Sequence, residues 1–463
     1  MGAGRDCQGR DAEHLLSLAI QGDGPFLLRH GAIDRRVVWR TLPRVIIPPT
    51  AAGIDAWLNA VPNRERTGQF RDMQVEGVRR LVTLLPPVPA PCTVAGTKGK
   101  GSTVRLIECA LVAAGQSTVA FTSPHVASVL ERWRVDGKPA HAAAVALACE
   151  RVAALEQQHH LALTYFERTF AVACLLAGQR PGTRFIVEVG LGGRLDCANA
   201  LDCAIAVLTH LSHDHREVLG PTLHHIAREK LAVSRADAPL VIAPQTPQAA
   251  LALWRQVPSF RATPVEPQRS LRINLRPAAP TVWAQTPSRP FDLSLPGEHQ
   301  QDNAATAAAV LALWAPEIDA ATIRRGFADA NLAARCQLVE HAGRTLLIDG
   351  AHNRESIAAT LAVARRRLRA GWRLIIGLAS DKEIDEIMQV IPPGMPVTRC
   401  GYDSPRARRD EQWPTAAQQW RWCDHIGEAL TIQPPHADLC ITGSFYLAGE
   451  ALTHLGHAGD LPG

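Results

Sequence analysis

The sequence predicts an α/β fold with two units, each built on a mainly parallel sheet covered by helices. Short apolar runs of strand length alternate with amphipathic stretches of helix length from about residue 93 onward. A glycine-rich turn joins the first of these strands to the first helix. The same alternation resumes on a smaller scale after about residue 333, and a chain of 463 residues is long enough for two or three domains.

The first half begins with two segments of helical spacing, after which expected strands alternate with expected helices. Residues 54–58 and 73–85 have helical spacing, and a proline-rich segment at 86–91 ends the second of them. A proline-interrupted, strand-like region covers 258–296, and an alanine-rich helix at 303–313 follows it. Between these segments we expect strands at 93–95, 118–121, 185–189, 204–208 and 240–243, and helices at 102–114 and 166–176.

The second half repeats this alternation of strands and helices. Ligands at such sheets bind beyond the carboxyl ends of the strands. We expect strands at 345–348, 373–376, 397–400 and 439–442, and helices at 354–368 and 445–455. We place a boundary near Ala333, which divides a larger α/β domain at 46–332 from a C-terminal α/β domain at 333–463. Residues 1–45 have no sustained periodicity, and we expect an extension that lacks stable packing.

Composition excludes several classes of protein. No apolar run reaches the ~18–20 residues of a membrane span, and the polar N-terminus lacks the apolar core of a signal peptide, so we expect a cytoplasmic protein without a membrane partner. The 11 cysteines are scattered without a CxxC pair, which favours reduced thiols over a zinc site. The net charge of +5 is spread out, and the run Arg365-Arg366-Arg367 suits a helix end, so no nucleic-acid partner is expected.

The strongest local signal is the segment Val94-Ala95-Gly96-Thr97-Lys98-Gly99-Lys100-Gly101-Ser102-Thr103. It follows an apolar strand and precedes a helix, where backbone N–H groups and the positive helix end can hold phosphate. Lys100 would reach the terminal phosphates, and the Ser102 hydroxyl could reach Mg²⁺. The strict Walker pattern is not met, because Val94 and Gly101 replace its first Gly and its Ser/Thr. Alone, the segment could also be a glycine turn with a surface lysine.

This variant spacing resembles the ATPase domain of the Mur ligase superfamily, and within it the chain resembles the folylpolyglutamate synthase/dihydrofolate synthase family. A series of blocks stands in the family's order from about residue 50 to residue 450. They are residues 96–102, Thr122-Ser123-Pro124-His125, Thr164-Tyr165-Phe166-Glu167, Glu188-Val189-Gly190-Leu191-Gly192-Gly193-Arg194, Asp214-His215, Arg228-Glu229-Lys230 and Asp349-Gly350-Ala351-His352-Asn353. The resemblance implies a Mur-ligase-like P-loop ATPase domain, followed by a smaller Rossmann-like domain.

The expected metal site is built from oxygen ligands at strand ends. Ser102, Ser123 and Glu188 supply oxygens there, and Mg²⁺ prefers hard oxygen ligands. The resemblance assigns the metal to Ser123, Glu188 and His215, and it implies two Mg²⁺ ions. By itself His215 could be a structural histidine, and Glu188 could simply pair with Arg194. Lys230 resembles the family's carbamylated lysine, a further metal ligand and catalytic group; its alternative is a solvated helical lysine.

The block Thr164-Tyr165-Phe166-Glu167 is the most informative about substrate. The resemblance places it against the pterin of dihydropteroate, where an aromatic pair could stack on the ring while Thr164 and Glu167 hydrogen-bond its nitrogens. The same spacing also suits a helix start, with Thr164 as N-cap and Glu167 completing a capping box. Both can hold at once.

The resemblance also implies nucleotide contacts and a reaction. It assigns ATP to Gly96, Thr97, Lys98, Gly99, Lys100, Gly101 and Ser102, together with Asn303, Arg335 and Asp349. Lys100, His352 and Lys230 would be the catalytic groups. The expected reaction joins a folate-type carboxylate (7,8-dihydropteroate, tetrahydrofolate or both) to L-glutamate through an acyl-phosphate, with ATP and Mg²⁺, in a monomer.

Two positions depart from the family pattern. Lys98 stands where the family nearly always has Asn, and Ala198 replaces its usual Thr. Three alternatives remain at this stage: another Mur-type ligase acting on a non-folate carboxylate, a catalytically retired ATP-binding paralogue, and a simple P-loop phosphotransferase.

Overall fold

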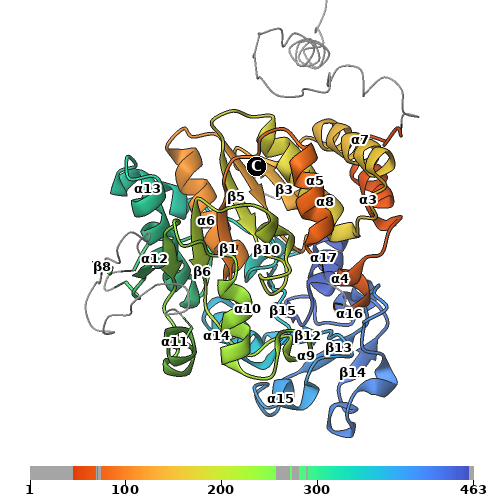
Figure 1. Cartoon of the computed structure of the whole chain (residues 1–463). Coiled ribbons are helices and arrows are strands. Elements are labelled where there is room, and N and C mark those ends of the chain that lie inside the picture. The colour runs from red at the N-terminus through yellow and green to blue at the C-terminus, as the bar shows by residue number, and fades with distance from the viewer. Residues whose placement is uncertain are drawn as a thin grey trace, which may run out of the picture. The chain divides into compact units, whose positions relative to one another are not determined.

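Two β-sheets organise the computed structural model, which describes residues 45–68, 70, 74–256, 272–273, 281–287 and 290–457 (Figure 1). Residues from Val45 onward form one compact unit. The expected extension at 1–45 lies outside the described residues except for Val45 itself, and much of the proline-interrupted region at 258–296 does too.

The first sheet is parallel at its centre and antiparallel at its edges. Parallel pairs run from β2 through β5, β1, β6 and β7 to β9, whereas β3, β4 and β8 pair antiparallel. Its described strands, in spatial order, are β4 (Lys138–Pro139), β3 (Trp133–Val135), β2 (Thr118–Phe121), β5 (Arg184–Glu188), β1 (Cys92–Ala95), β6 (Ile205–Leu208), β7 (Leu240–Ile242), β9 (Thr281–Trp283) and β8 (Arg272–Ile273).

Helices cover both faces of this sheet, because residues of its buried strands alternate between two apolar clusters. Val187 and Leu208 face one cluster and Ile186 and Val207 the other. The first face is covered by α3 (Ala51–Asn59), α5 (Glu76–Leu84), α7 (Ala142–His159), α8 (Tyr165–Gly178), α10 (Leu223–Leu231) and α11 (Pro247–Trp254). The second is covered by α6 (Lys100–Ala113), α12 (His299–Trp314) and α13 (Ala320–Ala328).

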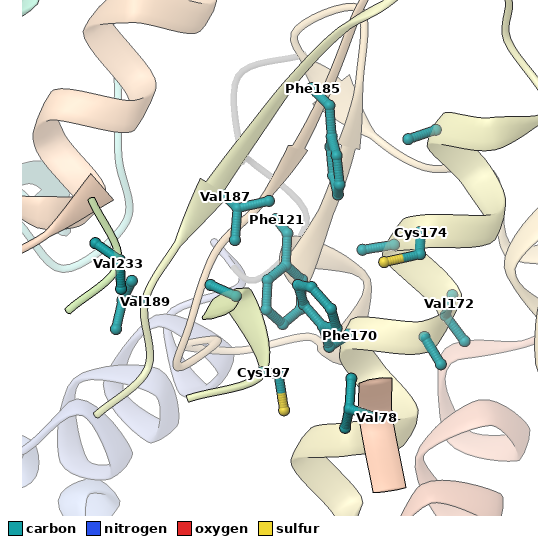
Figure 2. Packing of buried hydrophobic residues seen from close by; sticks show 14 of the residues in the cluster. Val78, Phe121, Phe170, Val172, Cys174, Phe185, Val187, Val189, Cys197 and Val233 are labelled. Atoms are coloured by element: carbon teal, nitrogen blue, oxygen red, sulfur yellow. The ribbon is translucent and has the colours of Figure 1, made fainter. Parts of the chain in front are cut away.

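The apolar cluster on the first face of the sheet packs against the start of α8. Figure 2 shows Phe121 of β2 beside Phe170 of α8, and their ring centroids are 5.8 Å apart at a near-perpendicular angle. Phe121 also contacts Phe166 at the start of α8, with centroids 5.7 Å apart. These two aromatic contacts, one edge-to-face and one tilted, hold the start of α8 against the sheet.

The second sheet is smaller, and it is also mainly parallel with helices on both faces. Its described strands, in spatial order, are β10 (Gln337–His341), β11 (Arg344–Ile348), β15 (Leu439–Thr442), β12 (Arg373–Ile376), β13 (Val397–Cys400) and β14 (Arg421–Cys423); β10 alone among these pairs antiparallel. Apolar clusters on its two faces involve α14 (Arg354–Arg367) and α15 (Ile384–Met388) on one side, and α16 (Ile426–Thr431) and α17 (Phe445–His454) on the other.

These observations confirm the predicted α/β fold with two mainly parallel sheets. The expected strands at 118–121, 373–376, 397–400 and 439–442 have the observed bounds. Each of the other expected strands differs from the observed strand by one residue at one end or at both ends. The change of sheet falls between α13 and β10, the interval that contains Ala333, although the proposed domain limits stay a prediction. Within the described part of the chain no helix is long and apolar enough to cross a membrane, and the ten described cysteines are buried without a disulfide.

Candidate functional site

One cavity of about 750 Å³ gathers nearly all of the residues selected from the sequence. Its walls come from the carboxyl ends of β1, β2, β5 and β6 and from loops of the second sheet. Of the predicted site residues, only Gly96 and Lys230 are absent from the lining. The volume falls in the usual range for a small-molecule site, about 300–1,000 Å³.

The segment 96–102, called the phosphate loop below, connects β1 to α6 (Figure 1). Gly99 is the residue before α6 and has a φ of 84°, a left-handed conformation that favours glycine. A Cβ there would lie 2.2 Å from Oδ1 of Asn303, so the loop and α12 approach closely. The loop is anchored to β6 because the carbonyl oxygen of His210 accepts the N–H groups of Thr97 and Lys98 at 3.0 and 3.1 Å.

Glu188 and Ser123 lie together at the ends of β5 and β2. The Ser123 N–H donates to Oε2 of Glu188 at 3.1 Å, and both residues are buried. Burial raises the pKa of Glu188, while the nearby Lys100 ammonium opposes that change. Gly101 faces the same carboxylate, since a Cβ there would lie 3.4 Å from Oε2 of Glu188. A buried carboxylate next to a lysine and a phosphate loop is suited to a cation that accompanies phosphate.

His215 reaches the cavity from the loop after β6. It caps α9 (Arg216–Leu219) with a φ of 49°, and its N–H donates to Oδ1 of Asp214 at 3.0 Å. Burial lowers the pKa of His215 to about 4, although Asp214 opposes this, so its imidazole is neutral and able to bind a metal near neutral pH. Lys382, in the loop after β12 of the second sheet, lies 4.0 Å from the Asp214 carboxylate and thereby joins the two sides of the site.

The donor set suits Mg²⁺ provided that hydroxyl, phosphate and water oxygens complete it. Ser102, Ser123 and Glu188 offer oxygens, and His215 offers a nitrogen in the same cavity. Across the described residues, no group of three or more His, Cys, Asp or Glu side chains could hold a metal by itself. Mg²⁺ usually keeps waters and phosphate oxygens around one or two carboxylates, so the residues present fit it.

Lys230 lies behind the phosphate loop. Its Nζ donates to the carbonyl oxygen of Gly96 at 2.8 Å, and the residue is only 5% exposed. Burial, with Lys100 as a smaller cause, lowers the pKa of Lys230 to about 7. A large neutral fraction near pH 7 is the condition under which an amine reacts with CO₂, so the proposed carbamylation is chemically accessible and stays a prediction.

The block Thr164-Tyr165-Phe166-Glu167 forms the start of α8 and closes a capping box. Thr164 donates from both its N–H and its hydroxyl to Oε2 of Glu167 at 2.7 Å. The capping alternative is therefore present, and it engages the two polar side chains expected to contact the pterin. Phe166 lies against the glycine loop after β5, because a Cβ at Gly190 would come within 2.6 Å of its ring. Tyr165 lines the cavity but is 1% exposed.

Loops next to strands β10 and β11 of the second sheet contribute Arg335, Asp349 and His352. Arg335 stacks over the Phe445 ring at 4.4 Å, and its guanidinium faces Gly101 of the phosphate loop. Asp349 accepts hydrogen bonds from the Cys336 N–H and the Thr360 hydroxyl, each at 2.7 Å, and so shapes its own loop.

The protonation of His352 follows from its backbone contact. Its Nδ1 lies 2.9 Å from the Gly350 carbonyl oxygen, which can only accept, so Nδ1 carries the hydrogen. Burial, and Lys382 nearby, lower the pKa of His352, which leaves a neutral ring with an unprotonated Nε2.

Sequence reasoning missed a buried ion pair in the cavity wall. Arg132, before β3, donates to both carboxylate oxygens of Glu65 at 3.3 and 2.5 Å and to Nδ1 of His125 at 2.9 Å. Its guanidinium lies 5.2 Å from the centre of the Tyr165 ring. Glu65 belongs to α4 (Arg64–Thr67), 67 residues before Arg132 in the chain. No local pattern marks such a pair, because each partner alone is typical of a solvated residue.

Asp196 was missed as well, although it stands two residues after the block that ends at Arg194. It is 1% exposed, and its Oδ2 accepts the N–H groups of Gly190 and Leu191 at 3.0 and 3.1 Å. Burial raises the pKa of Asp196 to about 6. This carboxyl group holds the glycine loop that faces Phe166.

Comparisons with known proteins identify relatives of this chain. No family model matches the sequence. The chain is 32% identical over 342 residues to the Escherichia coli dihydrofolate synthase/folylpolyglutamate synthase, covering 73% of this chain and 79% of that protein. It is 32% identical over 383 residues to the Bacillus subtilis protein of the same name, covering 77% and 88%.

A probable bifunctional folylpolyglutamate synthase/dihydropteroate synthase of Haloferax volcanii is 31% identical over 410 residues. That match covers 82% of this chain but only 48% of the longer archaeal protein, so the chain spans about half of it.

Solved structures give the same family. Mycobacterium tuberculosis folylpolyglutamate synthase complexed with ADP aligns with a TM-score of 0.74 and 25% identity, over 88% of this chain and 98% of that one. Escherichia coli FolC in complex with DHPP and ADP aligns with a TM-score of 0.71 and 26% identity, over 87% and 97%. The fold and the family expected from the sequence are confirmed. This chain therefore belongs to the dihydrofolate synthase/folylpolyglutamate synthase family of ATP-dependent ligases.

Proposed function

We propose that the chain forms an amide bond between a folate-type carboxylate, 7,8-dihydropteroate or tetrahydrofolate, and L-glutamate through an acyl-phosphate. The observation that carries this proposal is one cavity that joins the phosphate loop, the Glu188–Ser123 pair and the aromatic wall around Phe166. A cavity of about 750 Å³ has the size of a small-molecule site, and its lining includes both the phosphate loop and the aromatic residues Tyr165 and Phe166.

In the first step, a carboxylate oxygen of the folate-type substrate attacks the γ-phosphorus of ATP, and ADP leaves. Lys100 begins α6, so its ammonium and the positive end of the helix oppose the charge on the phosphoryl oxygens. Arg335, which lies just before β10 of the second sheet and is held over Phe445, supplies a further cation. Positioning and charge do most of the work in such a transfer, because little covalent help from the protein is required.

In the second step, the amine of L-glutamate attacks the acyl carbon, and phosphate leaves. The attacking ammonium must first lose a proton. His352 presents a neutral imidazole with an unprotonated Nε2 in the same cavity, and we assign it the role of proton acceptor. Tyr165 and Phe166 form an apolar wall that limits access of water to the acyl-phosphate.

Ser102, Ser123, Glu188 and His215 would hold Mg²⁺, with carbamylated Lys230 as the ligand of a second ion. When bound, Mg²⁺ neutralises phosphate charge and orients the phosphoryl group. The structures of related proteins that contain AMPPNP and a Mn ion support a divalent metal at a site of this kind.

The test is glutamate-dependent ADP release by the purified protein with Mg²⁺, offered 7,8-dihydropteroate and tetrahydrofolate separately. Release with one substrate or with both assigns the activity or activities. We expect Lys100→Ala and Glu188→Gln each to lower kcat at least about 100-fold, because each removes a group that faces the developing charge. Arg366→Gln, far from the phosphate loop in sequence and exposed, is the matched control and keeps normal turnover.

Removing the metal is an independent check. Chelation should abolish ADP release, and added Mg²⁺ should restore it. Near-normal turnover in Lys100→Ala or Glu188→Gln would contradict the assigned roles. ATP binding without turnover on either pteridine would favour a non-folate carboxylate or a retired paralogue.

A further inference from the structure

Lys98, the residue at which the phosphate loop departs from its family, makes a contact outside its own sheet. Its Nζ pairs with Oε2 of Glu355, a residue 257 positions later in the chain. The Lys98 side chain is 23% exposed and lines the cavity wall. Its backbone N–H is fixed to the His210 carbonyl oxygen, so this residue is held by its backbone on one side and by its side chain on the other.

Glu355 is well placed to receive that ammonium. It lies in the first turn of α14, which Asn353 caps by accepting the Ser356 N–H at 3.0 Å. The positive end of a helix stabilises a carboxylate in its first turn. The other carboxylate oxygen of Glu355 is 3.6 Å from Nε2 of His210, so one acidic group faces two residues of the first sheet's loops.

Because of its location, the Lys98–Glu355 pair should affect the position of the phosphate loop more than the stability of the whole protein. Glu355 is 56% exposed, and exposed ion pairs shift an equilibrium by at most about fivefold. The free energy of unfolding should therefore hardly depend on the Lys98–Glu355 ion pair. Lys98, however, lies directly before Gly99, where the loop turns and approaches Asn303, and a loop that must present its N–H groups to phosphate is sensitive to small displacements.

We propose that Glu355 is a positioning residue for ATP: it holds Lys98, and through Lys98 it keeps the phosphate loop of the first sheet in register with α14 of the second. This role rests on the proposed assignment of the loop to ATP. It accounts for an otherwise unfavourable feature, a further cation in a loop that already contains Lys100 and packs on Lys230, because Glu355 neutralises the added charge.

The experiment measures binding of a non-hydrolysable ATP analogue with Mg²⁺ by calorimetry, and the KM for ATP where turnover is available. Glu355→Gln and Lys98→Met should each weaken analogue binding about three- to fivefold at low ionic strength, and for Glu355→Gln kcat should change less than about twofold. The double variant should be no worse than either single variant, because both remove the same interaction. Lys98→Arg should retain most of the affinity, and the effect of Glu355→Gln should shrink in about 1 M salt.

Arg366→Gln is the matched control. Arg366 also joins α14 to the first half of the chain, through Glu298 at 2.8 Å, but its pair lies at the exposed far end of the helix and involves no residue of the phosphate loop. It should leave analogue binding unchanged. Equal losses in Arg366→Gln and Glu355→Gln would mean that α14 contacts act only in a general way, and would overturn the positioning role.

Two further results would also overturn it. Tighter analogue binding by Glu355→Gln would mean that this carboxylate competes with phosphate for Lys98. Additive losses in the double variant would mean that the two side chains act separately. If the unaltered protein did not bind the analogue at all, the assignment of the loop to ATP would fail together with the positioning role, whereas a failure of folate ligation alone would leave analogue binding intact.

Discussion

Replacing Glu65 by Gln should destabilise the protein by leaving the buried Arg132 guanidinium without a counter-ion. The Arg132 side chain is 1% exposed and that of Glu65 is 24% exposed. Burial alone would lower the pKa of Arg132, but the Glu65 carboxylate overcomes this and holds that pKa above its usual value. The charge on the Arg132 guanidinium therefore depends on a single acidic partner, Glu65, although His125 accepts a further hydrogen bond from Arg132.

The magnitude follows from these contacts. Breaking a buried ion pair by removing one partner costs about 3–5 kcal/mol. Glu65 is partly reached by water, and Gln retains one acceptor oxygen for the guanidinium, so we expect about 2–3 kcal/mol for Glu65→Gln. At about 2 °C per kcal/mol for a unit of this size, the midpoint of thermal unfolding should fall by about 4–6 °C.

Thermal unfolding followed by circular dichroism measures this directly. Glu298→Gln serves as the control, because its pair with Arg366 is exposed on both sides and should shift the midpoint by less than about 1 °C. Adding Arg132→Met to Glu65→Gln should recover stability, since no unpaired charge remains. A midpoint for Glu65→Gln within about 1 °C of the unaltered protein would refute the reasoning.

Three further predictions concern the phosphate loop, the second sheet and the buried lysine. Gly99→Ala should weaken ATP-analogue binding at least about tenfold in calorimetry, because a Cβ at a φ of 84° would also meet Asn303; unchanged affinity would contradict this. Asp438→Asn should cost about 1–2 kcal/mol at pH 7, since hydrogen bonds from the largely exposed Arg369 lower the pKa of Asp438 to about 2. That stability is present above the ordinary aspartate pKa and is lost as the pH falls toward 2, so denaturant titrations of variant and parent should converge there. Lys230→Met should abolish turnover yet raise the unfolding midpoint of the metal-free protein at pH 7, because burial lowers the pKa of Lys230 to about 7. Between that pH and the ordinary lysine pKa the unfolded chain holds the extra proton, so the parent gains stability as the pH rises and the gap should narrow toward pH 10; a lower midpoint for the variant would contradict this.

Local pattern was sufficient for the buried strands. Strands β2, β12 and β15 are mostly apolar because helices cover both faces of a parallel sheet, whereas β13 adds two buried polar residues, Thr398 and Arg399. The sequence did not predict β3, whose burial depends on a distant partner. Arg134 in that strand is buried only because Glu108 of α6 neutralises it, and from sequence alone a strand of this kind looks exposed.

Helix α7 and strand β10 were missed for other reasons. Alanine-rich α7 (Ala142–His159) has little contrast between its faces, so its periodicity is weak. Strand β10 (Gln337–His341) is an antiparallel edge strand with mostly exposed or half-buried residues. Both elements are defined by what packs or pairs with them more than by their own pattern.

The site divides in the same way. Residues that follow strands, such as Ser123, Glu188 and the phosphate loop, could be grouped in advance, because carboxyl ends of parallel strands meet at one sheet edge. The sequence by itself determined the fold class, the phosphate loop and the family, since each depends on local periodicity or on short ordered motifs. Only the tertiary structure decided the Arg132–Glu65 pair and the Lys98–Glu355 contact. The two ion pairs join segments far apart in the chain, and their energy depends on burial and distance, which no local pattern specifies.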